Sequence, residues 1–291
     1  MKNYEILELN KKVLDLNKKR YQLVKKSFEL GERPAIDTVE AFTQLQSFAA
    51  KTIESQNKFN ISTIELSQFL WKENGENYNL PLFTKPSEQL NTQFTQDYFI
   101  ITEKLLQNID AQYALNYYFE KSKSLELERK LKWQNFLPKI NFNYNLYNKE
   151  FKNQDILPLF DNNYQYGIKL ELPIFMREAR ADYQNIKLKI LQNNENIKFK
   201  NQELKTKIQT YNAEMGNFLS LTQNNESLIE NYKRLLKAEE IKFSNGESSL
   251  FLINSRENKL LETQEKFLEL KAKTIKTYFK LNWLENNTLK Q

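Results

Sequence analysis

The chain has 291 residues, of which 40% are hydrophobic and 27% are charged, and its formal net charge is +6. It contains no histidine and no cysteine, which excludes Cys-His and Ser-His nucleophiles, ordinary zinc sites and disulfide bonds. With only 5 glycines and 6 prolines there are few turn signals, so the composition predicts long, uninterrupted elements.

Sequence patterns also narrow the partners. Neither a GxGxxG nor a GxxxxGK[ST] phosphate loop occurs, so nucleotide binding is not expected. Lysines are interleaved with glutamates and do not cluster, which predicts solvated helix faces and not a nucleic-acid surface. No apolar run approaches the ~20 residues of a transmembrane helix. The first residues, MKNYEILELNKK, lack the apolar stretch of a signal peptide, so we expect none in this chain.

Residues 1–71 are expected to form an antiparallel helical hairpin with its turn near residue 31. Apolar positions recur at helical spacing before and after Gly31, and glycine is the usual residue just beyond a helix end. Pro34 follows that turn, where the missing N–H of proline costs nothing at the start of a helix.

A connector and a further helix come next. Residues 72–96 contain one glycine and two prolines and are predicted to be non-helical, with one short strand at Leu80 to Phe83. Residues 97–136 are expected to form one helix.

Residues 137–175 are predicted to form a β-hairpin, because apolar and polar side chains alternate along both arms. The apolar positions are Ile140, Phe142, Tyr144 and Leu146 in the first arm and Tyr164, Tyr166, Ile168, Leu170 and Leu172 in the second. Arms of about ten residues fit the strands of a transmembrane β-barrel. A soluble hairpin covering a core would alternate in the same way. We favour a transmembrane hairpin, because the surrounding sequence offers no other sheet and no globular core.

Residues 176–285 are predicted to form a long helix and a second helical hairpin with its turn near residue 246, followed by a tail at 286–291. A heptad stripe runs from Arg177 to Phe243 without a proline, which is typical of coiled-coil packing. The stripe begins with Tyr183, Ile190, Ile197, Leu204, Tyr211 and Phe218. At 1.5 Å per residue, such a helix is about 100 Å long.

The two helical hairpins are copies of one another. Residues 13–69 match residues 228–284 at a constant shift of 215 positions, and Gly31 coincides with Gly246. Matched apolar pairs include Phe28 with Phe243, Leu45 with Leu260 and Leu66 with Leu281. The repeat therefore covers both helices and the turn of each hairpin.

This combination of heptad helices, a repeated helical hairpin and a strand hairpin resembles the TolC-like outer-membrane efflux family. The resemblance is carried by RYQLVKKSFELGERPAIDTVEAFTQLQ from Arg20, LLKAEEIKFSNGESSLFLINSRENKLLETQ from Leu235 and LPIFMREARADYQ from Leu172. It implies a mainly α fold, in which long antiparallel coiled-coil helices form a trimeric α-barrel and a transmembrane β-hairpin contributes to a shared β-barrel. The implied function is an outer-membrane channel subunit, a passive export duct for a tripartite efflux or type I secretion system, with no cofactor and no enzymatic activity.

The resemblance also implies partners and location. The expected assembly is a homotrimer in the cell outer membrane that extends through the periplasm and contacts outer-membrane lipid. A periplasmic adaptor (membrane fusion) protein would bind it and connect it indirectly to the inner-membrane pump. Residues 72–96 would lie in the equatorial region. The repeat shift places the start of the first copy's long helix about 38 residues before Met1, so we expect an N-terminally incomplete chain without that part, its hairpin or the signal peptide.

By the family's pattern, the residues after each turn glycine are expected to form a tip constriction. Arg33, Asp37 and Glu40 take these places in the first copy, and Leu252 is an apolar counterpart in the second. Opposite charges at a narrow aperture bond between neighbouring protomers and filter ions by their own field. Ordinary solvated helix charges are the alternative interpretation.

Adaptor contact is expected at the two turns, because exposed turn residues are accessible to a partner's helical hairpin. The candidate residues are Leu30, Gly31, Glu32, Asn245, Gly246 and Glu247. Simple helix termination is the alternative, which glycine alone always supports.

An elongated, soluble coiled-coil scaffold is the alternative function from another class, and the missing signal peptide favours it. It predicts a water-soluble protein whose hairpin ignores detergent. The efflux hypothesis predicts that the complete protein fractionates with outer membrane as a heat-sensitive trimer.

Overall fold

The computed structural model describes residues 1–82, 84–87, 98–146, 164–172 and 175–287. The chain folds as two compact units. The first contains Met1–Gln107 and Lys207–Asn286, and the second is formed mainly by Asn108–Thr206. The long helix α5, Arg177–Ser244, contributes residues to both units. Its bounds coincide with the stretch over which the heptad stripe predicts a helix.

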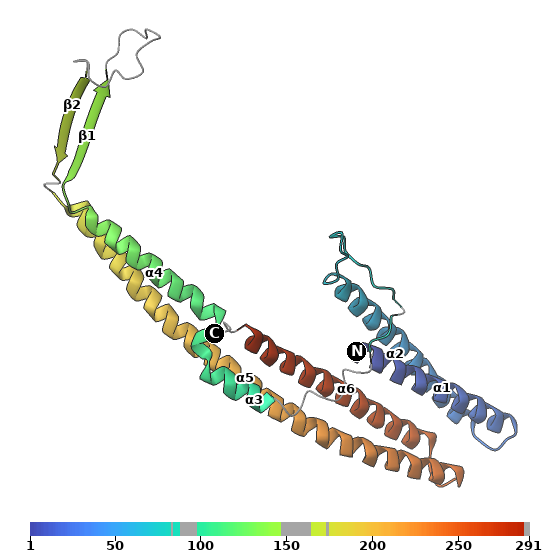
Figure 1. Cartoon of the computed structure of the whole chain (residues 1–291). Coiled ribbons are helices and arrows are strands. Elements are labelled where there is room, and N and C mark those ends of the chain that lie inside the picture. The colour runs from blue at the N-terminus through green and yellow to red at the C-terminus, as the bar shows by residue number, and fades with distance from the viewer. Residues whose placement is uncertain (83, 88–97, 147–163, 173–174, 288–291) are drawn as a thin grey trace, which may run out of the picture. The chain divides into compact units, whose positions relative to one another are not determined.

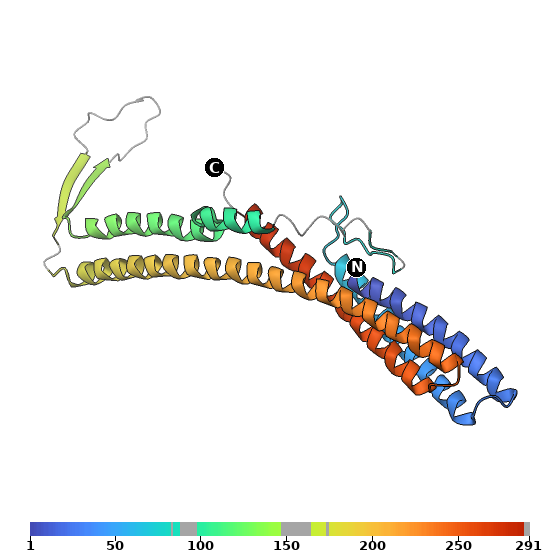
Figure 2. The same ribbon diagram turned by 90° about the horizontal axis from the view of Figure 1, so that it is seen from below.

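The first unit consists mainly of two helical hairpins. Helices α1 (Lys2–Glu29) and α2 (Ala35–Ser67) lie side by side and antiparallel (Figures 1 and 2). The C-terminal part of α5 pairs in the same way with α6 (Leu250–Asn286). A short helix, α3 (Tyr98–Gln107), packs against α6.

The core of this unit lies between the two hairpins, so each hairpin covers the other's apolar stripe. One cluster joins Val13 of α1 and Phe48 of α2 to Leu261 of α6. A second cluster, closer to the turns, joins Val24 and Ala41 of the first hairpin to Leu250 of the second. A single amphipathic hairpin buries only part of its apolar face, and packing two copies together removes more of it from water.

The second unit contains a helix, a two-stranded sheet and the N-terminal part of α5. Helix α4 (Tyr113–Gln134) runs beside α5 in both views (Figures 1 and 2), and the Asn193 side chain of α5 donates to the Tyr118 carbonyl of α4 at 3.0 Å. Strands β1 (Lys139–Leu146) and β2 (Tyr164–Glu171) pair antiparallel. The central part of the predicted hairpin, residues 147–163, lies outside the described residues, as do 173–174.

The single helix predicted over residues 97–136 is wrong in one respect, because the structure divides it. Helix α3 ends at Gln107, a short 3-10 turn, η2, occupies Ile109–Ala111, and α4 then begins at Tyr113. Asp110 accepts a hydrogen bond from the Asn201 side chain of α5 at 2.9 Å. Asn and Asp favour such local turns over helix interiors, so this break has a local signal that the apolar spacing concealed.

The connector after α2 also differs from prediction. The short strand expected at Leu80 to Phe83 is not formed by residues 80–82, and Phe83 lies outside the described residues, as do 88–97. The Leu80 N–H donates to the buried Ser67 hydroxyl at 2.9 Å, so a side chain satisfies it in place of a neighbouring strand. An isolated bridge instead joins Trp71 to Asn77 across a turn at Gly75, whose φ is +81°.

Candidate functional site

The turn between α1 and α2 is a Schellman motif, a glycine-dependent closure of a helix end. Gly31 has φ +76°, and its N–H donates to the Phe28 carbonyl at 2.9 Å. The next residue, Glu32, donates its N–H to the Ser27 carbonyl at 2.9 Å. These two bonds satisfy carbonyls that the helix end leaves free, and they require a left-handed residue at position 31.

The turn between α5 and α6 repeats this geometry. Gly246 also has φ +76°, and its N–H donates to the Phe243 carbonyl at 3.1 Å. Glu247 donates to the Lys242 carbonyl at 2.9 Å. Matching hydrogen bonds at matched positions support the interpretation of the two hairpins as copies of one unit.

Both turns lie at the same end of the first unit and are open to solvent (Figures 1 and 2). All six residues expected to contact an adaptor are exposed. A Cβ atom added at Gly31 or Gly246 would meet no atom within 4 Å. The glycines are therefore required by backbone conformation and not by lack of space.

Arg33 connects the two turns within one chain. Its guanidinium lies 3.6 Å from the centre of the Phe243 ring and donates to the Phe243 carbonyl at 3.2 Å. Asp37, one helical turn further on, lies 3.5 Å from the same guanidinium. A cation at the last turn of α5 is favoured by the helix dipole. Arg33 is therefore held in place by partners within its own chain.

The other two predicted constriction residues differ from one another. Glu40 accepts a hydrogen bond from the Asn254 side chain of α6 at 3.1 Å, so it too joins the two hairpins. Leu252 remains 40% exposed and belongs to neither core cluster near the turns. Arg33, Asp37 and Glu40 are thus brought to the contact between the hairpins, and Leu252 is not.

Sequence reasoning missed a polar contact between the hairpins that is centred on a buried carboxylate. Arg20 of α1 donates to both carboxylate oxygens of Glu257 on α6, at 2.7 and 3.2 Å. Asn17 donates to the same carboxylate at 3.0 Å, and Glu240 of α5 lies 3.6 Å from Arg20. Glu257 is only 5% exposed. The available signal was an asparagine, Asn17, at an inward heptad position of α1.

The two strands of the second unit have unlike faces. The register pairs Ile140 with Leu170, Phe142 with Ile168 and Tyr144 with Tyr166 on one face. The other face pairs Asn141 with Lys169, Asn143 with Gly167 and Asn145 with Gln165. Within the part of the chain that the structure describes, the apolar side chains are left uncovered, since Phe142 is 65% and Ile168 71% exposed. This sheet therefore presents an apolar face that needs another environment.

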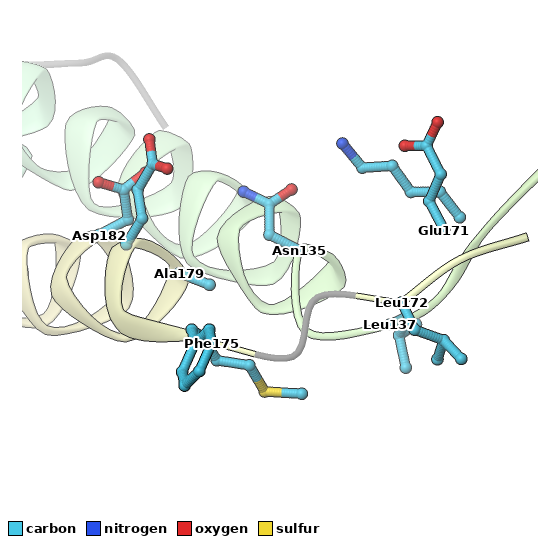
Figure 3. A pocket seen from close by; sticks show the side chains of 10 residues that line it. Asn135, Leu137, Glu171, Leu172, Phe175, Ala179 and Asp182 are labelled. Atoms are coloured by element: carbon cyan, nitrogen blue, oxygen red, sulfur yellow. The ribbon is translucent and has the colours of Figure 1, made fainter.

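A pocket of about 410 Å³ lies where α4, the strands and the start of α5 meet (Figure 3). Figure 3 shows Asn135, Leu137, Glu171 and Asp182 around it. The Asp182 carboxylate accepts a 2.6 Å hydrogen bond from Lys132, which raises the pKa of that lysine. Glu171 pairs with Lys169 at 2.7 Å. Because two of its carboxylates are already paired with lysines, we assign this pocket no chemistry.

Two features are absent from the described ranges. No group of three or more Asp and Glu side chains in these ranges is placed to hold a metal ion. Among the residues that the structure describes, no helix is both long and apolar enough to cross a membrane.

Comparison of the sequence with known protein families and with curated proteins gives no match. Solved structures do match. The outer membrane protein VceC of Vibrio cholerae has a TM-score of 0.74 at 12% identity, covering 98% of this chain and 66% of that one. The CmeC outer membrane channel of Campylobacter jejuni matches with a TM-score of 0.68 at 18% identity, covering 96% of this chain and 59% of that one. CusC, described in connection with transmembrane channel formation, matches with a TM-score of 0.66 at 16% identity, covering 98% of this chain and 65% of that one.

These matches place the chain in a structural class, that of mainly helical folds. More particularly, it has a TolC-like fold, that of the outer-membrane efflux channels, as its resemblance to that family predicts. The chain spans between 59% and 66% of the length of these three structures.

Proposed function

We propose that this protein is a subunit of an outer-membrane channel that forms a passive export duct. The observation that carries the proposal is the TolC-like fold over nearly the whole chain, shared with outer-membrane channels. In this role the protein performs no catalytic step and needs no cofactor. Substrate choice belongs mainly to the pump of a tripartite efflux or type I secretion system, because the duct is passive.

The strand pair supports an outer-membrane location for this part of the second unit. Its apolar face carries Ile140, Phe142 and Ile168, all well exposed, and its other face carries asparagines. Strands of a transmembrane β-barrel alternate in this way, with apolar side chains toward lipid and polar side chains toward the lumen. We therefore assign residues 137–175 to a membrane hairpin that joins a barrel shared between protomers.

The helical parts are assigned to a periplasmic tube formed by a homotrimer. Residues 1–71 and 176–285 supply its helical hairpins, 97–136 its intervening helical segment and 72–96 an equatorial connector. The extended length of α5, 68 residues, supports this assignment, because at 1.5 Å per residue it spans about 100 Å. The periplasmic adaptor is proposed to bind at the two Schellman turns, where the exposed residues from Leu30 to Glu32 and from Asn245 to Glu247 are accessible.

The tip constriction is proposed to involve Arg33, Asp37, Glu40 and Leu252. Within one copy, Arg33 bonds to Phe243 and Asp37, and Glu40 bonds to Asn254. These contacts support a closed tip by keeping the two turns of each protomer together. The exposed Leu252 is available to narrow the aperture with its counterparts in other copies.

Reconstitution tests the proposal. We expect the purified protein to insert into planar lipid bilayers when it is diluted from detergent, and to give discrete steps in single-channel current. The matched control is a variant with Phe142→Asp and Ile168→Asp, in which the apolar face is disrupted while the helices are unchanged. A protein that stays in the aqueous phase without detergent and gives no conductance would instead identify a soluble coiled-coil scaffold.

A further inference from the structure

A further pocket of the second unit lies where the chain leaves α4 and enters β1. It has a volume of about 540 Å³, and its lining includes Arg129, Lys130, Trp133, Leu137, Pro138 and Tyr183. Two of these side chains are cationic and two are aromatic, and no carboxylate from the described part of the chain lines the pocket. We call it the basic pocket.

The last turns of α4 gather cationic and aromatic groups on one side of the helix. Arg129 and Lys130 precede Trp133 by four and three residues, a spacing that places side chains next to one another. Trp133 is 53% exposed, so a ligand has access to its indole. Tyr183 of α5 completes the lining, and the Lys187 ammonium lies 4.9 Å from the centre of its ring. A third cation therefore stands beside the pocket.

The cations of the basic pocket are available to a ligand. Arg129 pairs with Glu126 at 2.7 Å, but the two side chains are 39% and 41% exposed, and exposed pairs contribute little stability. The guanidinium also has further N–H donors for a second acceptor. Within the described ranges, the Lys130 ammonium has no ion-pair partner. Asp182 of α5 is already paired with Lys132 at 2.6 Å.

The basic pocket lies at the base of the apolar sheet face. Pro138 directly precedes β1 and stands two residues before Ile140 and four before Phe142. Side chains two residues apart along an extended chain share a face, so Pro138 continues the apolar face of the strands. Ile140 is 70% and Phe142 65% exposed. A ligand in the pocket therefore borders the surface that the proposed function turns toward lipid.

The polar sheet face leads to a pocket of opposite charge. Lys139 pairs with Glu171 in the strand register, in line with the asparagines of that face. Both residues line the pocket of Figure 3, together with Glu178 and Asp182, so three carboxylates accompany one lysine there. Of the described charged residues, only cations line the pocket at the apolar face, and carboxylates predominate at the polar face. This asymmetry favours an anionic ligand that comes from the lipid side.

We propose that the basic pocket binds the headgroup of an anionic phospholipid. Its phosphate pairs with Arg129 and Lys130, and its glycerol and first acyl carbons lie against Trp133 and Pro138. A guanidinium matches the geometry of a phosphate, and tryptophan favours the boundary between headgroups and acyl chains. The lining has no carboxylate for the ammonium of a zwitterionic headgroup, so a net negative lipid is selected. This inference rests on the membrane hairpin of the proposed function and adds a lipid site to it.

Tryptophan fluorescence tests the site, because Trp133 lines the pocket and the chain has only 3 tryptophans. In the full chain, Trp71→Phe and Trp283→Phe leave Trp133 as the single reporter. The protein is reconstituted into phosphatidylcholine vesicles that contain brominated phosphatidylglycerol or brominated phosphatidylcholine, since bromine on an acyl chain quenches a nearby indole. Half-quenching is expected at about tenfold less of the brominated phosphatidylglycerol, because basic residues at a membrane surface attract anionic lipid.

Charge variants in the same single-tryptophan chain locate the preference. Arg129→Gln combined with Lys130→Gln is expected to make the two brominated lipids equally effective. Lys121→Gln combined with Lys205→Gln removes two exposed cations of the same unit outside the pocket and is expected to keep the preference. Arg129→Lys combined with Lys130→Arg keeps both charges and is expected to keep most of it. Circular dichroism confirms that the helices of each variant are formed.

A second reporter separates the lipid site from the membrane hairpin. Ile140→Trp, combined with Phe in place of all 3 natural tryptophans, reports contact of the apolar sheet face with lipid. Quenching at position 140 without quenching of Trp133 overturns the lipid site alone. Quenching at neither position overturns both the site and the membrane hairpin.

The remaining outcomes also decide the proposal. Equal quenching of Trp133 by the two brominated lipids, or a preference that survives Arg129→Gln with Lys130→Gln, overturns the headgroup site. Loss of the preference when inorganic phosphate is added, but not when chloride is added at equal ionic strength, identifies a site for free phosphate and overturns the lipid as its ligand. A tenfold preference that only the pocket variant removes supports the proposal.

Discussion

The Arg33 guanidinium stacks 3.6 Å from the centre of the Phe243 ring. It thereby links the turn between α1 and α2 to the end of α5, next to the turn between α5 and α6. The same side chain donates to the Phe243 carbonyl and pairs with Asp37. Phe243 is also the residue whose carbonyl accepts the Gly246 N–H. One aromatic residue therefore takes part in closing its own helix and in holding the neighbouring hairpin.

Arg33→Ala is expected to destabilise the first unit by about 1–2 kcal/mol, through loss of the cation–π contact and of a charged hydrogen bond. Arg33→Lys keeps the charge but loses the planar stacking. Its stability is expected to lie between that of Arg33→Ala and that of the unaltered protein. Urea unfolding followed by circular dichroism measures both. Lys25→Ala, an exposed change on α1, is the control. Equal stability of Arg33→Ala and the unaltered protein would contradict the fastening role.

The tip constriction predicts a separate effect on conductance. Arg33→Ala or Asp37→Ala is expected to raise single-channel conductance in the reconstituted protein, because either change loosens the contact between the turns. Lys25→Ala is expected to leave the current unchanged. No increase in either tip variant, with normal trimer content, would count against a gate at these residues.

Gly246 separates backbone strain from partner contact. Its φ of +76° costs an L-residue roughly 1–2 kcal/mol, and a β-branched residue more than asparagine. Because no atom lies within 4 Å of an added Cβ, a side chain here projects into solvent. Gly246→Asn is expected to keep membrane abundance with reduced export, and Gly246→Val to lose export most. Abundance by immunoblot and export by cells are compared. Parallel loss of both would indicate a folding role only.

The buried pair of Arg20 and Glu257 gives a thermodynamic prediction. Glu257→Ala leaves Arg20 and Asn17 without their main acceptor and is expected to cost about 3–5 kcal/mol in unfolding free energy. The double variant Arg20→Met and Glu257→Leu removes both charges and is expected to recover most of that loss. Chemical denaturation of Glu257→Ala and of the double variant measures how much of the unfolding free energy is recovered. A double variant as unstable as Glu257→Ala would mean that apolar packing does not replace what the pair of Arg20 and Glu257 contributes to the unfolding free energy.

The two faces of the strand pair predict opposite tolerance to charge. Ile168→Lys places a charge on the exposed apolar face and is expected to cost about 2–4 kcal/mol in a membrane-embedded barrel. Asn143→Lys adds the same charge on the other face and is expected to be tolerated. Outer-membrane fractionation and the heat-sensitive trimer band report the difference. Similar behaviour of both variants would argue against a lipid-facing sheet surface.

Much of the fold was predictable because its signals are local. The turn positions followed from a glycine at the end of each helical pattern, and both glycines adopt φ +76°. The long helix predicted from 177 to 243 corresponds to α5 at Arg177–Ser244. The break at residues 108–112 was missed, because the apolar spacing continues across it while Asp110 bonds to a distant side chain, Asn201.

The sequence alone determined the repeat, the heptad period, the two turns and the alternation of the strands. Each depends on residues close along the chain, where helix and strand geometry sets the spacing. Only the tertiary structure decided that Arg33 reaches Phe243, 210 positions later, and that Arg20 selects Glu257, 237 positions later. Each arginine has many acidic and aromatic residues available in the sequence. The choice among them depends on how the helix surfaces meet, which periodicity does not encode.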